Sequence, residues 1–334
     1  MDKLITLEDL TKAVKSNYSK LIKEGQVKSI LRNIGVFVDQ TVDNTILILL
    51  QNPDATCVKR LTEWNYYKRN IKKDEKAIKI ISHHIYSNNL GFKEENGKIY
   101  TDGTEKLKVE VGYLFDIAQT VGKSYEYLNT NKETIAKYFD CTKKALEYTA
   151  KGYKFVYDDC EESYQIDNEK KEIHIKDGMT LDETINTLIK VVSIVALNSR
   201  HYEGLKKENL ENIADIELYG TIYAVNSRLG LDLPEYDFSA LENLSDEQLE
   251  DFKGNLQKIR SVSKQLIANV ESNIEYTIRN LHKTQNQETK QEDTKEQSQK
   301  TEESTNKENI EASDRPKAKR TTRTKSKQNI SEVE

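Results

Sequence analysis

The chain has 334 residues, which is enough for two domains of ordinary size and a tail. Its three cysteines, Cys57, Cys141 and Cys160, lack the spacing of a metal site, and their odd number argues against a disulfide framework. No apolar run reaches the roughly 18 residues of a membrane span, and the N-terminal MDKLITLEDL is not a signal peptide, so we expect a cytoplasmic protein without membrane association.

Charge is distributed unevenly along the chain. Residues 1–125 contain 20 basic and 16 acidic residues, whereas residues 126–282 contain 19 basic and 29 acidic residues. Because an acidic surface repels a phosphate backbone, the first third of the chain is the part suited to nucleic acid.

An α+β first domain is expected over residues 1–145. Residues 5–51 are predicted to form helices, since apolar side chains recur with a period near 3.6 and Pro53 closes the last helix. Residues 55–120 are predicted to form an antiparallel sheet, with turns at Asn96-Gly97 and Asp102-Gly103. Residues 131–150 have a helical pattern again.

A mostly helical second domain is expected over residues 146–282. It begins with short strands, two of which form a hairpin around Asp167-Asn168. A buried helix follows at residues 181–197, where Thr180 and Glu183 form a capping box, and another helix ends at Gly230.

The longest helix is predicted to start at Ser245 and to carry a one-sided apolar stripe. Packing within its own domain and a coiled-coil dimer are both open for this amphipathic helix. Residues 283–334 contain almost no apolar residue, so we expect a disordered charged tail. The stretch from Arg315 to Lys327 is either a nonspecific nucleic-acid arm or a solubilising linker.

The most informative stretch is residues 59–79, which contains eight Lys or Arg and three acidic residues. It contains the aromatic residues Trp64, Tyr66 and Tyr67. Cations that follow phosphates, next to flat side chains that stack on bases, are typical of single-strand binding. The alternative is a solvated basic hairpin in which Trp64 is buried.

Two ordered blocks resemble the N-terminal domain of the antirestriction protein ArdC family. The first contains Asn44, the segment QNPDAT at residues 51–56, Trp64, Arg69 and KKDEKAI at residues 72–78, although Asp74 stands where the family usually has Gly. The second is LFDIAQT at residues 114–120. The resemblance implies single-strand DNA binding. The candidate contacts are Asn44, Gln51, Lys59, Arg60, Trp64, Tyr67, Lys68, Arg69, Lys72, Lys73, Lys76, Lys79 and Gln119.

The second domain resembles the zincin-like metallopeptidase half of the same family, in which an H-E-x-x-H helix holds zinc. By register, the two ligand positions fall on Lys190 and Ile194, the general-base position falls on Val191, and the third ligand position falls on Glu217. Lys190 and Ile194 cannot bind zinc as histidine does, and Val191 cannot act as a general base. We therefore expect a degenerate domain with no metal, no cofactor and no catalysis. An ion pair between Lys190 and Glu217 in place of the metal is one hypothesis, and a plain surface Glu217 is the other.

The family resemblance implies a protein of a mobile element, such as a plasmid, that protects incoming single-stranded DNA or counters restriction. Restriction or conjugation proteins are further candidate partners. Two other functions stay open: a protein-interaction module without enzymatic activity, and a zinc metallopeptidase whose ligands lie elsewhere.

Overall fold

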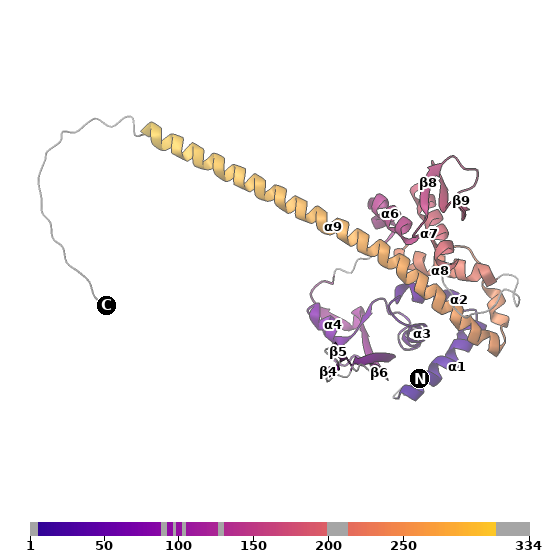
Figure 1. Ribbon diagram of the computed structural model, residues 1–334. Helices are drawn as coiled ribbons and strands as arrows, with labels where there is room; N and C mark the ends of the chain where they lie inside the picture. The colour runs from indigo at the N-terminus through magenta and orange to yellow at the C-terminus, as the bar shows by residue number, and fades with distance from the viewer. Residues whose placement is uncertain are drawn as a thin grey trace, which may run out of the picture. The chain divides into compact units, whose positions relative to one another are not determined.

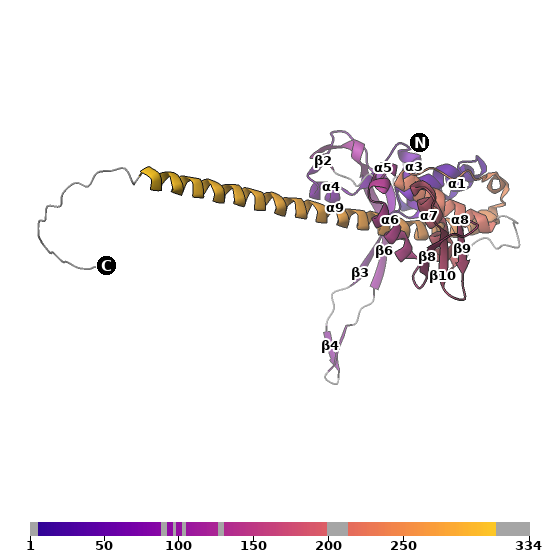
Figure 2. The ribbon, with the colours of Figure 1, turned by 90° about the horizontal axis from the view of Figure 1, so that it is seen from above.

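The computed structural model describes residues 6–87, 92–95, 98–101, 105–125, 130–198 and 213–311 (Figures 1 and 2). The chain divides into two compact units, Met1–Thr277 and Ile278–Glu334. Helices and small sheets alternate along the first unit, which confirms the expected α+β class. The expected domain boundary at residue 145 stays a prediction.

Three helices open the first unit: α1 (Leu7–Lys23), α2 (Val27–Val36) and α3 (Val42–Gln51). Thr6 and Asp9 form a capping box at the start of α1, and the Thr41 hydroxyl accepts the Asn44 N–H at the start of α3. Gly35 lies so close to α8 that a Cβ placed on it would lie 2.0 Å from the Ala224 carbonyl oxygen. A glycine is therefore what allows α2 and α8 to approach each other.

The main sheet of this part is antiparallel, with strand order β1 (Val58–Lys59), β6 (Glu105–Asp116) and β3 (Ile78–Ser87). Two further antiparallel pairs are β2 (Arg69–Ile71) with β7 (Thr120–Gly122), and β4 (Phe92–Glu95) with β5 (Lys98–Thr101). Helix α4 (Leu61–Tyr66) connects β1 to β2, and a 3₁₀ turn (Ile117–Gln119) connects β6 to β7. The pairing confirms the predicted antiparallel sheet, while the expected turns at residues 96–97 and 102–103 lie outside the described residues.

Helices α5 (Lys132–Lys137) and α6 (Phe139–Thr149) lead to a second sheet. Its strands are β8 (Lys154–Asp158), β9 (Tyr164–Asp167) and β10 (Glu172–Lys176). Strands β9 and β10 form the predicted hairpin, and β8 pairs with β10 in parallel. Helix α7 (Leu181–Asn198) starts at the expected capping box, in which the Thr180 N–H donates to the Glu183 carboxylate at 2.8 Å.

Two helices complete the described chain: α8 (Ile213–Leu229) and α9 (Asp246–Glu311), with a 3₁₀ turn (Ser239–Asn243) between them. The capping box of Ser245 and Gln248 starts α9 as predicted. The helix continues through residue 311, and the expected disorder of residues 283–334 stays a prediction. Its Gln, Glu and Lys residues have high helix propensity, so the helix extends without an apolar stripe.

The core of the first unit lies between helices from both ends of the sequence. It joins α1, α2 and α3 to α8 and to the beginning of α9, and the Tyr18 hydroxyl donates to the Leu249 carbonyl inside it at 2.9 Å. The apolar stripe of α9 is almost completely buried from Leu249 through Ile274. The stripe therefore packs within the same chain, and it contacts α1–α3 of the expected first domain as well as α8 of its own, so the expectation of packing within its own domain alone is wrong.

Candidate nucleic-acid interface

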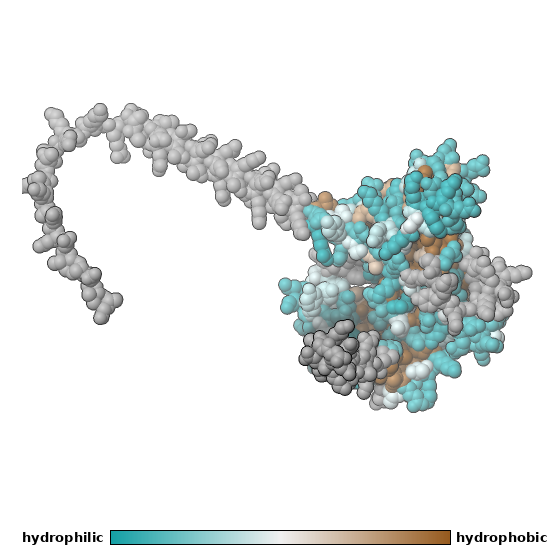
Figure 3. Space-filling view, viewed as in Figure 1, coloured by the Kyte–Doolittle hydropathy of each residue, from teal (hydrophilic) through white to brown (hydrophobic). Residues whose placement is uncertain are grey.

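The basic stretch surrounds α4, the short helix between β1 and β2. The N–H of Arg60 donates to the Glu63 carboxylate at 2.8 Å and so fixes the first turn of α4. The helix ends at Tyr66, and Lys68 has a positive φ of 59° that turns the chain into β2. In Figures 1 and 2, α4 lies on the opposite side of the first unit from β8 and β9, and the surface over α4 in Figure 3 is hydrophilic.

Trp64 is not part of this surface. Its side chain has no exposed area, its indole N–H donates to the Phe115 carbonyl at 2.9 Å, and its ring meets Tyr125 edge-on at 5.3 Å. The expectation that Trp64 stacks on a base is therefore wrong, and the alternative of a buried tryptophan is correct. Trp64 is buried because it lies on the side of α4 that faces β6.

Two tyrosines at the end of α4 take its place on the surface. Tyr66 is 78% exposed and Tyr67 is 37% exposed, and their ring centres are 5.2 Å apart. Tyr67 also contacts Tyr125 at 4.6 Å, and the Lys59 ammonium lies 5.5 Å from the Tyr67 ring centre. The sequence singled out Tyr66 only as one aromatic of the stretch, yet it is the most exposed of these rings.

The lysines and arginines of the stretch differ in what they already bind. Arg69 donates to the Thr120 hydroxyl and to the Thr120 and Lys123 carbonyls, so it ties β2 to β7. Arg60 donates to the Ser82 hydroxyl, and Lys72 donates to the Ala118 carbonyl at 2.7 Å. These three cations are positioned by the fold, and their donors are partly occupied.

Other cations of the stretch are more accessible. Within the part of the chain that the structure describes, no hydrogen bond or ion pair engages the ammonium groups of Lys68, Lys73 and Lys76, all of which are exposed. Lys59 is half-buried against the tyrosine rings, and Lys79 is half-buried on β3. We call the set of Lys59, Tyr66, Tyr67, Lys68, Lys73 and Lys76 the basic face.

Asn44 and Gln51 do not reach the basic face, because both amides are bonded to the free edge of β3. Asn44 Oδ1 accepts the Ile81 N–H and Asn44 Nδ2 donates to the Ile81 carbonyl, both at 2.9 Å. Gln51 repeats the pattern on Lys79 at 3.0 and 2.8 Å. The two side chains stand seven residues apart on α3 and replace a neighbouring strand, so they satisfy backbone groups rather than bases.

Gln119 has a similar structural role. Its Oε1 accepts the Asp116 N–H, and its Nε2 donates to the Lys76 carbonyl and to the Glu75 carboxylate, each at 2.9 Å. Asp116 is itself buried and accepts the backbone N–H groups of Thr56 and Cys57. The two sequence blocks therefore meet in one hydrogen-bond network that holds the sheet together.

The degenerate zinc positions lie around α7 and α8. Val191 is completely buried, and the Lys190 ammonium lies 5.3 Å from the Tyr164 ring centre. Glu217 instead accepts hydrogen bonds from Asn255 at 2.8 Å and from Lys258 at 2.6 Å, both on α9. The suggested pair of Lys190 and Glu217 does not form, because α9 lies against Glu217 and supplies its partners.

A metal site is not visible in the described residues, since none of them forms a group of three or more His, Cys, Asp or Glu with suitable geometry. No helix in the same part of the chain combines the length and apolarity needed to cross a membrane.

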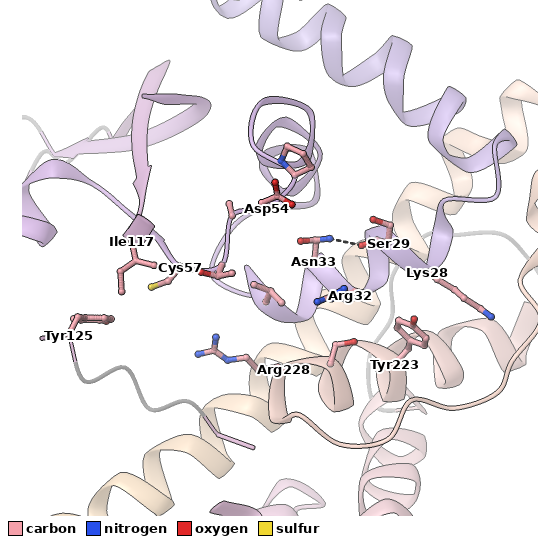
Figure 4. A pocket seen from close by; sticks show the side chains of 15 residues that line it. Lys28, Ser29, Arg32, Asn33, Asp54, Cys57, Ile117, Tyr125, Tyr223 and Arg228 are labelled. Atoms are coloured by element: carbon pink, nitrogen blue, oxygen red, sulfur yellow. Dashed lines mark hydrogen bonds between the residues drawn. The ribbon is translucent and has the colours of Figure 1, made fainter. Parts of the chain in front are cut away.

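A cavity of about 870 Å³ lies beside the basic face. It is lined by α2, by the loop of residues 53–57 and by the last turn of α8 (Figure 4). Tyr125, which contacts Tyr67 of the basic face, lines it as well. This cavity therefore adjoins the exposed aromatic rings.

Two crystal structures of the antirestriction protein ArdC from the R388 plasmid match this chain. The metal-free structure has 13% identity and a TM-score of 0.38, over 70% of this chain and 84% of that chain. The Mn(II)-bound structure has 15% identity and a TM-score of 0.35, over 70% of this chain and 87% of that chain. The chain is similar to ArdC. These structures carry the name of the family that the two sequence blocks resemble.

No protein-family model matches the chain, and no curated protein matches it either. The identities and TM-scores of the two ArdC structures are low, so what this chain binds has to be inferred from its own residues.

Proposed function

We propose that this chain is a single-stranded DNA-binding protein of the antirestriction type, and that its second half has no peptidase activity. The observation that carries the proposal is the exposed ring of Tyr66, 78% accessible and adjacent to Tyr67, among lysines whose ammonium groups are exposed. An exposed aromatic is costly to keep in water and is suited to stacking on an unpaired base.

The geometry favours a single strand over a duplex. Bases in a duplex are stacked on each other and offer only their edges, whereas a single strand can place its bases on the two tyrosines. Lys68 comes directly before β2, and Lys73 and Lys76 follow it, so exposed ammonium groups that can bind phosphates flank this strand. The resemblance of the two blocks to the ArdC family and the mobile-element setting that it implies support the antirestriction role.

Two competing functions make different predictions. A protein-interaction module would not retain an oligonucleotide, and an active zinc metallopeptidase would contain stoichiometric metal. Lys190, Val191 and Ile194 supply neither a neutral imidazole nor a water-activating carboxylate, so we propose that hydrolysis does not occur.

The decisive experiment measures fluorescence anisotropy with labelled single- and double-stranded oligonucleotides over a range of salt concentrations. About four phosphate contacts, at about −0.7 per contact, give a slope of roughly −3 for log affinity against log salt. The single strand should bind more tightly than the duplex. A response that ignores salt would refute the electrostatic part of the proposal.

The role of the exposed ring is tested by Tyr66→Ala, which should weaken single-strand binding by about 1–3 kcal/mol because one stacking platform is lost. The matched control is Tyr276→Ala on α9, a tyrosine that is 68% exposed and does not belong to the basic face. Equal binding by the wild type and both variants would show that Tyr66 does not stack on DNA.

A further inference from the structure

The cavity beside the basic face has a cationic lining. Lys28 and Arg32 on α2 contribute two positive charges, against the single carboxylate of Asp54, and Arg228 on α8 adds a guanidinium that is paired with Glu271. Figure 4 shows the guanidinium of Arg228 directed toward the cavity, in the direction of Cys57. An excess of positive charge in a recess attracts anions.

The guanidinium of Arg228 is fixed in place from behind. Its Nε donates to Glu271 at 2.7 Å and its Nη2 donates to the second carboxylate oxygen at 3.3 Å. Glu271 is largely shielded from water, and burial raises the pKa of its carboxyl while Arg228 opposes that rise. A two-point ion pair therefore orients this arginine toward the recess instead of leaving it mobile.

Two other polar groups of the lining have no partner in the described residues. No hydrogen bond or ion pair engages the guanidinium of Arg32, and the hydroxyl of Ser227 is buried without a hydrogen-bond partner. A buried hydroxyl without a protein partner can form a hydrogen bond with a bound polar group. Both groups belong to the same recess as Arg228.

The lining also offers a flat surface. Tyr125 lies at the side of the cavity near Cys57 (Figure 4), and its neutral phenol ring does not repel a phosphate. The volume of about 870 Å³ falls within the range of roughly 300–1,000 Å³ found for small-molecule sites.

The cavity shares lining residues with a second recess that reaches the basic face. A smaller recess of about 140 Å³ is lined by Lys59 of the basic face together with Cys57 and Arg228, which also line the larger cavity. The Lys59 ammonium is 5.8 Å from the Tyr125 ring centre. Single-stranded DNA that contacts Tyr66 and Tyr67 therefore lies close to the cavity.

We propose that this cavity binds one nucleotide, with its phosphate on Arg32 and Arg228, its base against Tyr125 and a polar group on the Ser227 hydroxyl. The proposal rests on single-strand binding at the basic face and adds a second, enclosed subsite to it. The nucleotide comes either from the bound strand or from a free mononucleotide, since both present the same phosphate and base.

The test combines Arg32→Gln with a reporter at Cys57. Arg32 is exposed, so its replacement leaves the fold intact, which an unchanged thermal midpoint verifies. Lys12→Gln on α1 removes one exposed charge away from both surfaces and is the matched control. Lys28→Gln is a second variant of the lining.

The reporter experiment measures the alkylation of each cysteine by mass spectrometry. Deoxyadenosine 5′-monophosphate should slow the modification of Cys57 in the wild type severalfold, without affecting Cys160, which does not line the cavity. Unphosphorylated deoxyadenosine should give no protection. Arg32→Gln should abolish the protection, and Lys12→Gln should retain it.

The binding experiment measures oligonucleotide affinity. Arg32→Gln should lower it by roughly tenfold, because a charge-assisted contact is lost, and should make the salt slope about 0.7 less steep. Protection by the mononucleotide with unchanged oligonucleotide affinity would support a free nucleotide as the ligand. Loss of oligonucleotide affinity without protection would support a nucleotide of the strand.

The proposal is overturned if neither effect appears, if Arg32→Gln and Lys12→Gln lose equal affinity, or if deoxyadenosine protects as well as its monophosphate. If the wild type binds oligonucleotides and the variants of the cavity lining bind them with the same affinity, the basic face is the whole binding site. Wild-type protein that binds no oligonucleotide would instead refute the function of the basic face, and the mononucleotide arm would still test the cavity.

Discussion

The clamp of Asn44 on β3 yields a prediction that separates a structural role from a DNA-binding role. Asn44 is only 4% exposed, and its amide bonds both the N–H and the carbonyl of Ile81. The substitution Asn44→Ala removes both hydrogen bonds at once. The free edge of β3 then has no partner at this position, because β6 pairs with the other edge.

The size of the effect follows from these two bonds. Each contributes about 0.5–1.5 kcal/mol, and a buried backbone group left without a partner costs more than the bond was worth. Ile81 is half-buried, so water replaces the amide only in part. We expect a loss of about 2–4 kcal/mol in the free energy of unfolding, which corresponds to a shift of roughly 1 M in the urea midpoint.

Trp64 provides the assay, because it is the only tryptophan of the chain and its indole donates to Phe115 on β6. Its fluorescence reports the opening of the sheet that the clamp protects. Asn17→Ala is the control, since the Asn17 amide donates to Ala13 of its own helix and should cost little stability. Gln51→Ala should reproduce the loss, because Gln51 makes the same pair of bonds to Lys79.

An unchanged urea midpoint together with weaker oligonucleotide binding by Asn44→Ala would refute this reasoning. It would show that the amide contacts nucleic acid and that the edge of β3 needs no clamp. A lower midpoint with wild-type affinity in the remaining folded protein is the expected result.

Three further outcomes follow from the structure. Treatment with a chelator should leave the thermal midpoint unchanged, because the positions of the family's zinc ligands hold no suitable donors, and a drop would reveal a metal site. Glu217→Ala should lower the free energy of unfolding by roughly 2–3 kcal/mol in urea titrations followed by circular dichroism, because Lys258 loses its partner in a largely buried ion pair. Lys190→Ala should lower it by only about 0.5–1 kcal/mol, because only the contact with Tyr164 is lost. Burial raises the pKa of the Cys57 thiol above its ordinary value of 9.0, so its alkylation should keep accelerating above pH 9 in folded protein and should level off earlier in urea, and identical pH profiles would contradict the burial.

Sequence alone determined the features that depend on neighbouring residues. The capping boxes at Thr180 and Ser245, the hairpin around Asp167-Asn168 and the apolar stripe of α9 follow from local spacing, and the structure confirms them. The excess of basic residues at 59–79 was also evident from the sequence. Composition shows which charges are present, but not which of them the fold already uses.

Tertiary structure decided which side chains are available for binding. Trp64 and Tyr66 stand two residues apart on a helix of six residues, and the position of β6 buries the first and leaves the second exposed. Arg69, Asn44 and Gln119 bond to segments 37 to 54 residues away in the sequence or to their own turn, and no local pattern reveals such partners. The cavity arises where α2, the loop before β1 and α8 meet, so its charges became a set only when these distant segments packed against one another.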